Sequence, residues 1–346
     1  MSTPKFSIII PIYNAEVSIT KTIKVLKEFD NANFEILLVN DGSTDSTEKV
    51  VNDSIGEDPR FHLFTKKNEG PGLARNYGIE RARGDYLLFF DADDYPEKTI
   101  LNDYALIISN NPRLDLIVSS FIFRTMNQEK VADEKEYLVT EHIYDDNEEF
   151  LSDMYELMNK QLMYVVWNKC YRRDLIIKNK IRFKDYRSCE DRIFNLDYYK
   201  HCSLVVMNPK VEYVYEFVGG QGITNQYNQE KFATFKEFYE RGNAITNNEI
   251  REGMAALLLK GTTSVIFSIL ETEKITRKQK KIEIDSILND TSIVEAKQYA
   301  ITDTTTKKIT KLLFNMPRPL LLLVLNAGTF VETKMPGVMA LLKRKY

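Results

Sequence analysis

The stretch from Leu87 to Asp94 most constrains what this chain can fold into, because four large apolar residues run directly into three carboxylates within four positions. An apolar run of this kind is typical of a strand that is buried on both faces, as in a parallel sheet. Since an unpaired buried charge is very costly, the carboxylates must lie where the strand leaves the sheet. In open parallel sheets that carboxyl edge is where ligands bind.

Two of these carboxylates, Asp91 and Asp93, are spaced to act together. Residues two apart in an extended chain point the same way, so both side chains aim at one point and repel unless a cation lies between them. Hard divalent ions prefer such oxygen ligands. We therefore predict a Mn²⁺ or Mg²⁺ site at Asp91 and Asp93. The alternative is a solvated acidic turn that caps a helix beginning near Pro96.

Length and composition narrow the class of protein. A chain of 346 residues suggests two domains, or one domain with an extension. A net charge of −3 predicts no nucleic-acid partner. Three cysteines at no metal spacing, with no signal peptide before them, favour reduced thiols in a cytosolic protein. Because the three histidines are scattered, we expect carboxylates to carry any chemistry.

Apolar strand-like runs alternate with helical periodicity over about the first 125 residues, which predicts an α/β fold with a doubly wound, mostly parallel sheet. Asn14 suits the N-cap of the first helix, and Asp45 with Glu48 has capping-box spacing for the second. A third helix is expected from Leu73 to Arg83. The predicted strands are Phe6–Ile12, Phe34–Val39, Phe61–Thr65, Leu87–Phe90 and Leu114–Phe123.

Beyond these strands the pattern changes. The polar, acidic stretch from 127 to 153 is expected to be a connector, and two short strands are expected at 204–206 and 211–214. From Lys231 onward the periodicity is helical. We therefore predict a first domain over residues 1–225, whose acceptor-side portion is about 126–225, and a mostly helical region over 226–346.

Three predicted strand ends converge at one edge of the sheet: Pro11–Asn14, Asp41–Ser43 and Asp91–Asp93. There Tyr13 is suited to stack on a planar base, and Asp41 to accept from a base N–H or a ribose hydroxyl, although packing and an ordinary turn also explain them. No glycine-rich phosphate loop follows the first strand, which argues against a dinucleotide fold and a P-loop. A diphosphate would instead be held by the metal and by Arg75.

With these motifs the chain resembles the family-2 inverting glycosyltransferases, which have the GT-A fold. The likeness covers about residues 5 to 225, and its specificity lies in the combination. The matching segments are Ser7–Asn14, Leu38–Asp45, Asn68–Asn76, Phe89–Asp94, Trp167–Arg172 and Glu190–Asp191.

The resemblance implies roles for individual residues. Asp41 would contact the nucleobase, Asp91 and Asp93 would form the metal-binding Asp-x-Asp, and Asp191 would be the catalytic base. Glu190 would position the acceptor or pair with a cation. For Asp191 the alternative is a surface ion pair with Arg187 or Arg192. The residues expected to contact the donor are Pro11, Tyr13, Asn14, Asp41, Asn68, Arg75, Asp91 and Ala92.

The sequence also departs from the family pattern. Gly222-Ile223-Thr224 stands where the family usually has Ser-Ile-Thr, and no histidine lies nearby to add a metal ligand. The Gln-x-x-Arg-Trp signature of processive synthases is absent, which indicates one sugar per encounter. The implied function is metal-dependent transfer of a hexose or N-acetylhexosamine from a nucleotide-sugar donor, commonly a UDP-sugar. The acceptor would be a glycan or lipid-linked glycan in bacterial surface-polysaccharide synthesis.

The apolar run Leu320–Leu325 and the basic cluster Lys343–Lys345 suit a segment that lies on an anionic membrane surface. Pro317 and Pro319 make the surrounding stretch a poor spanning helix, since such a helix needs about 20 predominantly apolar residues. The expected location is therefore cytoplasmic, peripheral at the inner face of the membrane. The alternatives are that the leucines pack against the helices from Lys231 onward or form a homo-oligomer contact.

Two other functions compete with glycosyl transfer. A haloacid-dehalogenase-type phosphohydrolase would use Asp91 as nucleophile, but its motif normally ends in Thr and lies in the first strand. Here three strands precede Asp91, and Asp94 follows Asp93. A non-catalytic, transferase-like binding module is the second alternative. The presence of Asp41, Asp91, Asp93 and Asp191 argues against it.

Overall fold

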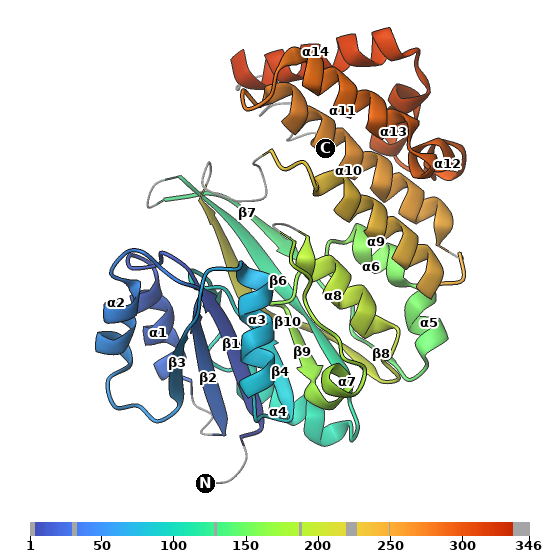
Figure 1. Cartoon of the computed structure of the whole chain (residues 1–346). Helices are drawn as coiled ribbons and strands as arrows, with labels where there is room; N and C mark the ends of the chain where they lie inside the picture. The colour runs from blue at the N-terminus through green and yellow to red at the C-terminus, as the bar shows by residue number, and fades with distance from the viewer. Residues whose placement is uncertain are drawn as a thin grey trace. The chain divides into compact units, whose positions relative to one another are not determined.

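The computed structural model describes residues 4–29, 33–127, 130–186, 189–218, 227–248 and 250–334. The chain divides into two compact units, Met1–Gly222 and Ile223–Tyr346 (Figure 1). The predicted Gly222–Thr224 motif, Arg187 and the basic cluster Lys343–Lys345 lie outside the described residues.

The first unit begins with four parallel strands in the order β3-β2-β1-β4. Phe6 of β1 lies opposite Phe34 of β2 on one side and Tyr86 of β4 on the other. Every residue of β2 and β4 is buried, as their mostly apolar sequences predict. The strands are β1 (Phe6–Ile12), β2 (Phe34–Asn40), β3 (Phe61–Thr65) and β4 (Tyr86–Phe89), and the helices between them are α1 (Ile19–Lys27), α2 (Thr47–Ile55) and α3 (Pro71–Arg81).

The same sheet continues with antiparallel and parallel pairs. Strand β9 (Lys169–Arg172) runs antiparallel between β4 and β6 (Leu116–Asn127), and β10 (Val205–Val218) runs parallel to β6. The remaining helices of this unit are α4 (Ile100–Asn110), α5 (Asn147–Ser152), α6 (Met154–Asn159), α7 (Arg173–Lys178) and α8 (Glu190–Tyr199). The sheet flanked by helices confirms the α/β class, and its second half is mixed rather than parallel (Figure 1).

The predicted connector over 127–153 is wrong. Lys130–Tyr137 forms β7, which pairs with β6, and His142–Tyr144 forms β8, which pairs with β10. Nearly all side chains of β7 are exposed, so a polar sequence is compatible with a strand at the edge of a sheet. The polar sequence is explained by the exposed edge position, and the strand conformation is explained by backbone pairing with β6.

Two other boundaries differ because of pairing with β10. Tyr95–Pro96 forms a short strand, β5, against Tyr213 and Val214, so the following helix begins at Ile100. The two strands predicted at 204–206 and 211–214 are one strand, interrupted by register shifts after Asn208 and Val211. Such irregularities bend a strand without ending it.

Neither Asn14 nor the pair Asp45 and Glu48 caps a helix as predicted. Helix α1 begins after Ser18, and Asn14 has a positive φ of 48°, a conformation that Asn adopts more readily than most residues. Glu48 does not form a capping box with Asp45, because its carboxylate accepts from Asn40 Nδ2 and Thr65 Oγ1. In both places a tertiary partner replaces the local one.

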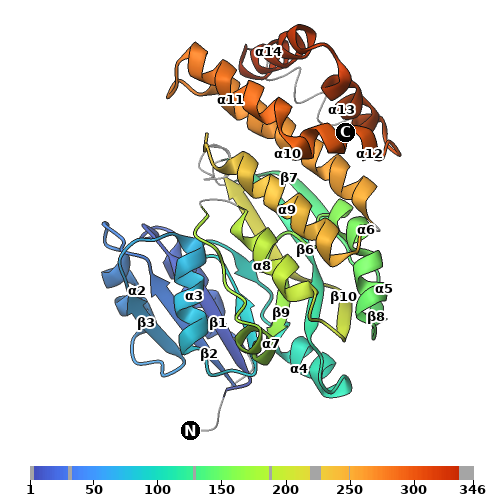
Figure 2. The same ribbon diagram turned by 45° about the vertical axis from the view of Figure 1, so that its right-hand side comes forward.

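The second unit consists of helices, which confirms the predicted helical extension (Figure 2). Among the described residues one helix, α10, is long and apolar enough to cross a membrane, and 61% of its apolar window is buried within the protein. A mostly buried helix of this kind is also typical of a protein core. The helices are α9 (Lys231–Ile245), α10 (Arg251–Glu271), α11 (Arg277–Asn289), α12 (Thr291–Tyr299), α13 (Thr305–Asn315) and α14 (Arg318–Lys334).

Candidate active site

The carboxyl ends of β1, β2 and β4 meet because these strands are neighbours and parallel. The Asp41 N–H donates to the Ile12 carbonyl at 2.8 Å, and Thr22 Oγ1 donates to the Ala92 carbonyl at 2.9 Å. Pro11 lies in β1, in register with Val39. The structure therefore brings the three predicted strand ends together at one edge of the sheet.

Asp41 is buried and holds the neighbouring loop. Its two carboxylate oxygens accept from Lys66 Nζ at 2.8 Å, from the Gly70 N–H at 2.7 Å and from the Glu69 N–H at 3.1 and 3.2 Å. A carboxylate has about four acceptor positions, so these contacts nearly saturate it. The predicted contact of Asp41 with a nucleobase stays a prediction, and it would have to share or replace these bonds.

Gly42 lets this loop approach. Its φ is +70°, and a Cβ there would lie 2.7 Å from the Asn68 backbone nitrogen. Any larger residue would therefore push the 68–70 loop away from Asp41.

Tyr13 and Asn68 are exposed at the same edge, and 51% of the surface of Tyr13 is accessible. An accessible ring is compatible with the predicted base stacking. Asn14 is engaged within the protein, since its N–H donates to Ser43 Oγ and its side-chain oxygen accepts from the Thr44 N–H. Its contact with the donor is untested.

Arg75 of α3 connects the strand ends with α8. Its Nη2 donates to Asp91 Oδ1 at 2.8 Å, and its Nη1 donates to Glu190 Oε1 and Asp191 Oδ1, both at 3.1 Å. Burial alone would lower the pKa of the guanidinium, but the charges of Asp191, Asp91 and Glu190 hold it above its usual value. Arg75 was predicted to hold a diphosphate. The structure places it between three carboxylates, and the phosphate contact stays a prediction.

Asp191, the predicted base, lies in the first turn of α8 and pairs with Arg75, and the guanidinium of Arg192 lies over the Tyr164 ring. Desolvation raises the pKa of Asp191 against the opposing charge of Arg75, and with the added effect of the Glu190 and Asp91 charges the pKa reaches about 7. Its side chain keeps 21% of its surface accessible. A carboxyl group with these properties can exchange a proton near neutral pH.

Asp91, Asp93 and Asp94 form a turn with excess negative charge. Neighbouring atoms crowd the Asp93 carboxyl although the residue as a whole is exposed, and this desolvation with the charge of Asp91 raises its pKa to about 6. Burial, followed by the charges of Asp91 and Asp93, raises the pKa of Asp94 well above its usual range. Tyr213 donates to Asp94 Oδ2 at 3.0 Å, whereas Asp94 Oδ1 has no hydrogen-bond partner among the described residues.

This turn fits a divalent cation only as a partial site. No group of three or more His, Cys, Asp or Glu side chains in the described part of the chain is arranged to hold a metal. Mg²⁺, however, is commonly held by one or two carboxylates together with substrate phosphates and water. The uncompensated charge and the unpartnered oxygen of Asp94 are what a cation would relieve.

Buried residues that were not predicted as site residues contact the site residues from inside the protein. Lys169 is fully buried and donates to the carbonyls of Leu162 and Val165 and to Asn168 Oδ1. Burial lowers its pKa well below the usual range, while the charge of Asp191 opposes that shift. Trp167 stacks on Tyr213 at 4.8 Å, and Tyr213 also accepts from the Asp91 N–H. Trp167 and Lys169 lie in the matching segment Trp167–Arg172, for which no individual roles were predicted.

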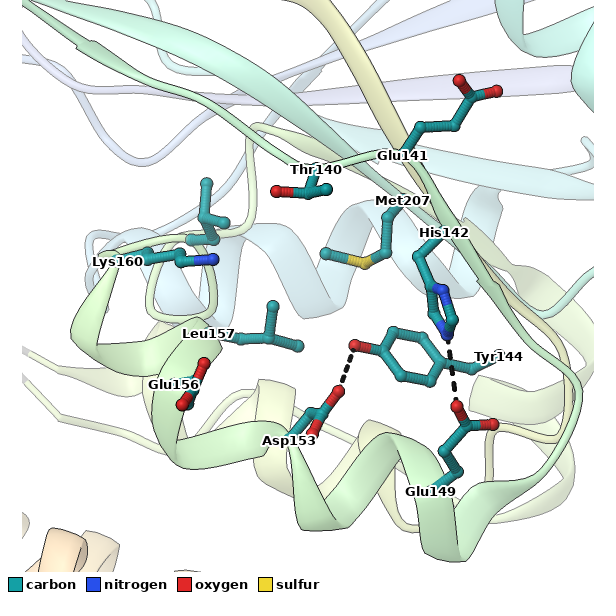
Figure 3. A pocket seen from close by; sticks show the side chains of 11 residues that line it. Thr140, Glu141, His142, Tyr144, Glu149, Asp153, Glu156, Leu157, Lys160 and Met207 are labelled. Atoms are coloured by element: carbon teal, nitrogen blue, oxygen red, sulfur yellow. Dashed lines mark hydrogen bonds and ion pairs between the residues drawn. The ribbon is translucent and has the colours of Figure 1, made fainter.

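A separate hollow of about 270 Å³ lies in the first unit (Figure 3). In it, Tyr144 donates to Asp153 at 2.9 Å, and His142 pairs with Glu149 at 3.3 Å. None of the residues that line it belongs to the predicted donor, metal or base set. Its volume is slightly below the range of about 300–1,000 Å³ usual for small-molecule sites.

Comparison with known proteins agrees with the expected family. The model of glycosyl transferase family 2 matches residues 7–180. One relative is EpsH of Bacillus subtilis, which is named as a glycosyltransferase. It is 27% identical over 263 residues, covering 73% of this chain and 72% of EpsH. The poly(ribitol-phosphate) beta-N-acetylglucosaminyltransferase TarS of Staphylococcus aureus is 27% identical over 300 residues, or 82% of this chain. The match spans about half of TarS, 48% of its length.

Solved structures share the fold. Residues 1–349 of S. aureus TarS in complex with UDP-GlcNAc superpose with a TM-score of 0.64 at 22% identity, covering 94% of this chain and 89% of that one. A mannosyltransferase from Pyrobaculum calidifontis in complex with GDP-Man and Mn²⁺ gives a TM-score of 0.51 at 13% identity, covering 91% and 87%. The family match excludes the phosphohydrolase, and the presence of Asp41, Asp91, Asp93 and Asp191 argues against the non-catalytic module. The chain belongs to glycosyl transferase family 2 and is a glycosyltransferase.

Proposed function

We propose that this enzyme transfers one sugar, with inversion, from a UDP-sugar to a hydroxyl group of a glycan or lipid-linked glycan in cell-surface polysaccharide synthesis. The observation that carries the proposal is the guanidinium of Arg75, which binds both Asp91 at the strand end and Asp191 on α8. Arg75 thus links Asp191, a carboxyl group with a near-neutral pKa, to Asp91 at the sheet edge where the donor is predicted to bind. TarS supports the donor class, because its structure was determined with UDP-GlcNAc.

Asp91 and Asp93 are the residues that would hold Mn²⁺ or Mg²⁺, with diphosphate oxygens as further ligands. When bound, the metal ion would neutralise the charge that develops on the leaving nucleoside diphosphate. Tyr213 supports this position, since it accepts from the Asp91 N–H and donates to Asp94. The carboxylates of this turn are thereby kept at the sheet edge.

Asp191 is the group that would take the acceptor's proton. As the acceptor oxygen forms its bond to the anomeric carbon, the bond from that carbon to the diphosphate oxygen breaks, and the hydroxyl proton passes to the Asp191 carboxylate. Glu190 shares Arg75 with Asp191, and we assign it a positioning role. One displacement from the side opposite the leaving group inverts the anomeric centre.

Ligand-dependent melting followed by a hydrolysis screen tests this proposal. Melting temperatures are measured with UDP, with Mn²⁺ and with both, because a ligand that binds the folded state raises its stability. We expect the combination to stabilise the protein more than the sum of its parts, and one nucleotide sugar of a panel to be hydrolysed slowly. Equal stabilisation by UDP with and without Mn²⁺ would overturn the metal assignment. Preference for a nucleotide other than UDP would overturn the donor class.

A further inference from the structure

The last helix of the described chain, α14, is apolar on two sides. Leu321 and Leu325, four residues apart, are buried, and α14 packs on α10. Leu320, Leu323 and Val324 repeat at three and four residues on another side, where 44%, 66% and 38% of their surface is accessible. A helix that is apolar all round is normally buried all round. In the described chain, this second stripe remains exposed.

Basic residues accompany the exposed stripe. Helix α14 lies beside α11, because Arg318 is 3.8 Å from Asp285 and also bonds to Asn289 (Figures 1 and 2). The first two turns of α11 expose Lys278 and Lys281. Helix α13, which leads into α14, exposes Lys308 together with Leu312, 60% of which is accessible. Exposed leucines and lysines thus lie on neighbouring helices.

The two units also differ in charge. The helical unit, Ile223–Tyr346, has 19 Lys and Arg against 13 Asp and Glu, a net charge of +6, whereas the whole chain carries −3. The first unit therefore carries −9. An anionic surface would attract the helical unit and repel the other one.

We propose that the exposed face of α11, α13 and α14 docks on an anionic membrane surface. The face is defined by the apolar residues Leu312, Leu320, Leu323 and Val324 and by the cations Lys278, Lys281 and Lys308. The leucines enter the boundary between headgroups and acyl chains, and the lysines stay with the lipid phosphates. A self-contact through the same face would bring together two helical units that each carry a net charge of +6, which disfavours a dimer there.

Vesicle co-sedimentation of the full chain tests this inference. The vesicles are phosphatidylcholine alone and phosphatidylcholine mixed with phosphatidylglycerol. We expect the wild-type chain to pellet with the mixed vesicles only, and the bound fraction to fall as salt is raised, because salt screens exposed charges. A chain that stays in the supernatant with mixed vesicles at low salt would overturn the proposal.

Matched variants locate the contact. Leu323→Glu is compared with Leu106→Glu on α4, where 63% of the leucine is accessible. We expect Leu323→Glu to weaken partitioning about tenfold or more, because burial of a leucine is lost, and Leu106→Glu to have no effect. Lys278→Glu is expected to weaken it about fivefold or more, since each cation near the surface contributes about 1 kcal/mol. Equal binding by the two leucine variants would contradict the assignment.

Two further measurements separate this inference from folding and from the proposed function. Both leucine variants should melt like the wild type and should keep the stabilisation by UDP with Mn²⁺, because both side chains are exposed. Light scattering gives the mass in solution. A wild-type dimer that Leu323→Glu converts to a monomer, with no vesicle binding by either, would reassign the face to self-association and overturn membrane docking.

Discussion

Two loops at the same edge of the sheet, one after β2 and one after β4, carry carboxylates that differ in their hydrogen bonding. The carboxylate after β2 is nearly saturated with donors, whereas those after β4 are not. Asp41, after β2, accepts from a lysine and from two backbone N–H groups of the neighbouring loop after β3. Asp93 and Asp94, after β4, crowd one another, and Asp94 keeps one oxygen without a partner among the described residues. The carboxylate of Asp41 is satisfied within the protein. In the turn after β4, Arg75 and Tyr213 offset only part of the repulsion among the three carboxyl groups, and a bound cation would offset more of it.

This difference indicates where a ligand is needed for stability. Removing charge from the loop after β2 should weaken the fold, because its partners would be left unsatisfied. Removing charge from the turn after β4 should relieve repulsion in the protein without ligands and abolish the response to a cation. The predictions below run from the largest expected effect to the smallest.

Asp93→Ala is expected to abolish transfer while leaving the fold intact, because the diphosphate would lose its counter-ion. Without metal, its melting temperature should equal or exceed that of the wild type, since one of the repelling carboxylates is gone. Transfer assays and melting curves check both. Asp53→Ala on α2, an exposed carboxylate, is the control. Normal turnover of Asp93→Ala, or full wild-type activity in excess EDTA, would contradict the metal assignment.

Asp191→Asn keeps the shape of the side chain but cannot take up a proton. We expect transfer to fall by ~10²–10⁴-fold, the usual range for loss of a general base, with donor binding preserved. Steady-state kinetics give kcat, and melting with UDP and Mn²⁺ reports donor binding. Loss of donor binding instead would place Asp191 in the nucleotide site.

Asp41→Asn is expected to lower the free energy of unfolding by about 1.5–3 kcal/mol, the usual contribution of a hydrogen bond to a charged group. Urea unfolding measures this change. Glu69→Gln is the matched control, because Glu69 is 51% exposed and its pair with Lys66 is screened by solvent. Unchanged stability with lost donor binding would show that Asp41 serves the nucleotide rather than the loop.

The pH dependence of kcat should report Asp191. Because desolvation and the neighbouring carboxylates raise its pKa to about 7, the deprotonated base is lost as the pH falls through that value. We expect kcat to be half-maximal near pH 7 and to level off about one pH unit above that value, so that activity at pH 6 is about tenfold lower than at the plateau. The acid limb should disappear from the residual activity of Asp191→Asn. An acid limb near pH 4 would contradict the desolvated position of the base.

The sequence predicted the parallel half of the fold well and the mixed half poorly. In β1, β2 and β4 both faces are buried, so the strands are mostly apolar and recognisable, although Ser7, Glu35 and Asn40 are polar. In β7 both faces are largely exposed, and its polar sequence resembles a loop. Pairing of Tyr95–Pro96 with β10 likewise leaves no periodic signal in two residues.

The candidate site shows the same division. The apolar run before Asp91 alone determined that the carboxylates lie at the end of a buried strand, because charge cannot follow that run into the core. Only the tertiary structure decided that Arg75, 116 residues before Asp191, would pair with it, with Glu190 and with Asp91. Burial and helical or strand periodicity can be recognised from the order of nearby residues in the sequence. Ion pairing depends on which helices the sheet brings together, and that is fixed by packing over the whole unit.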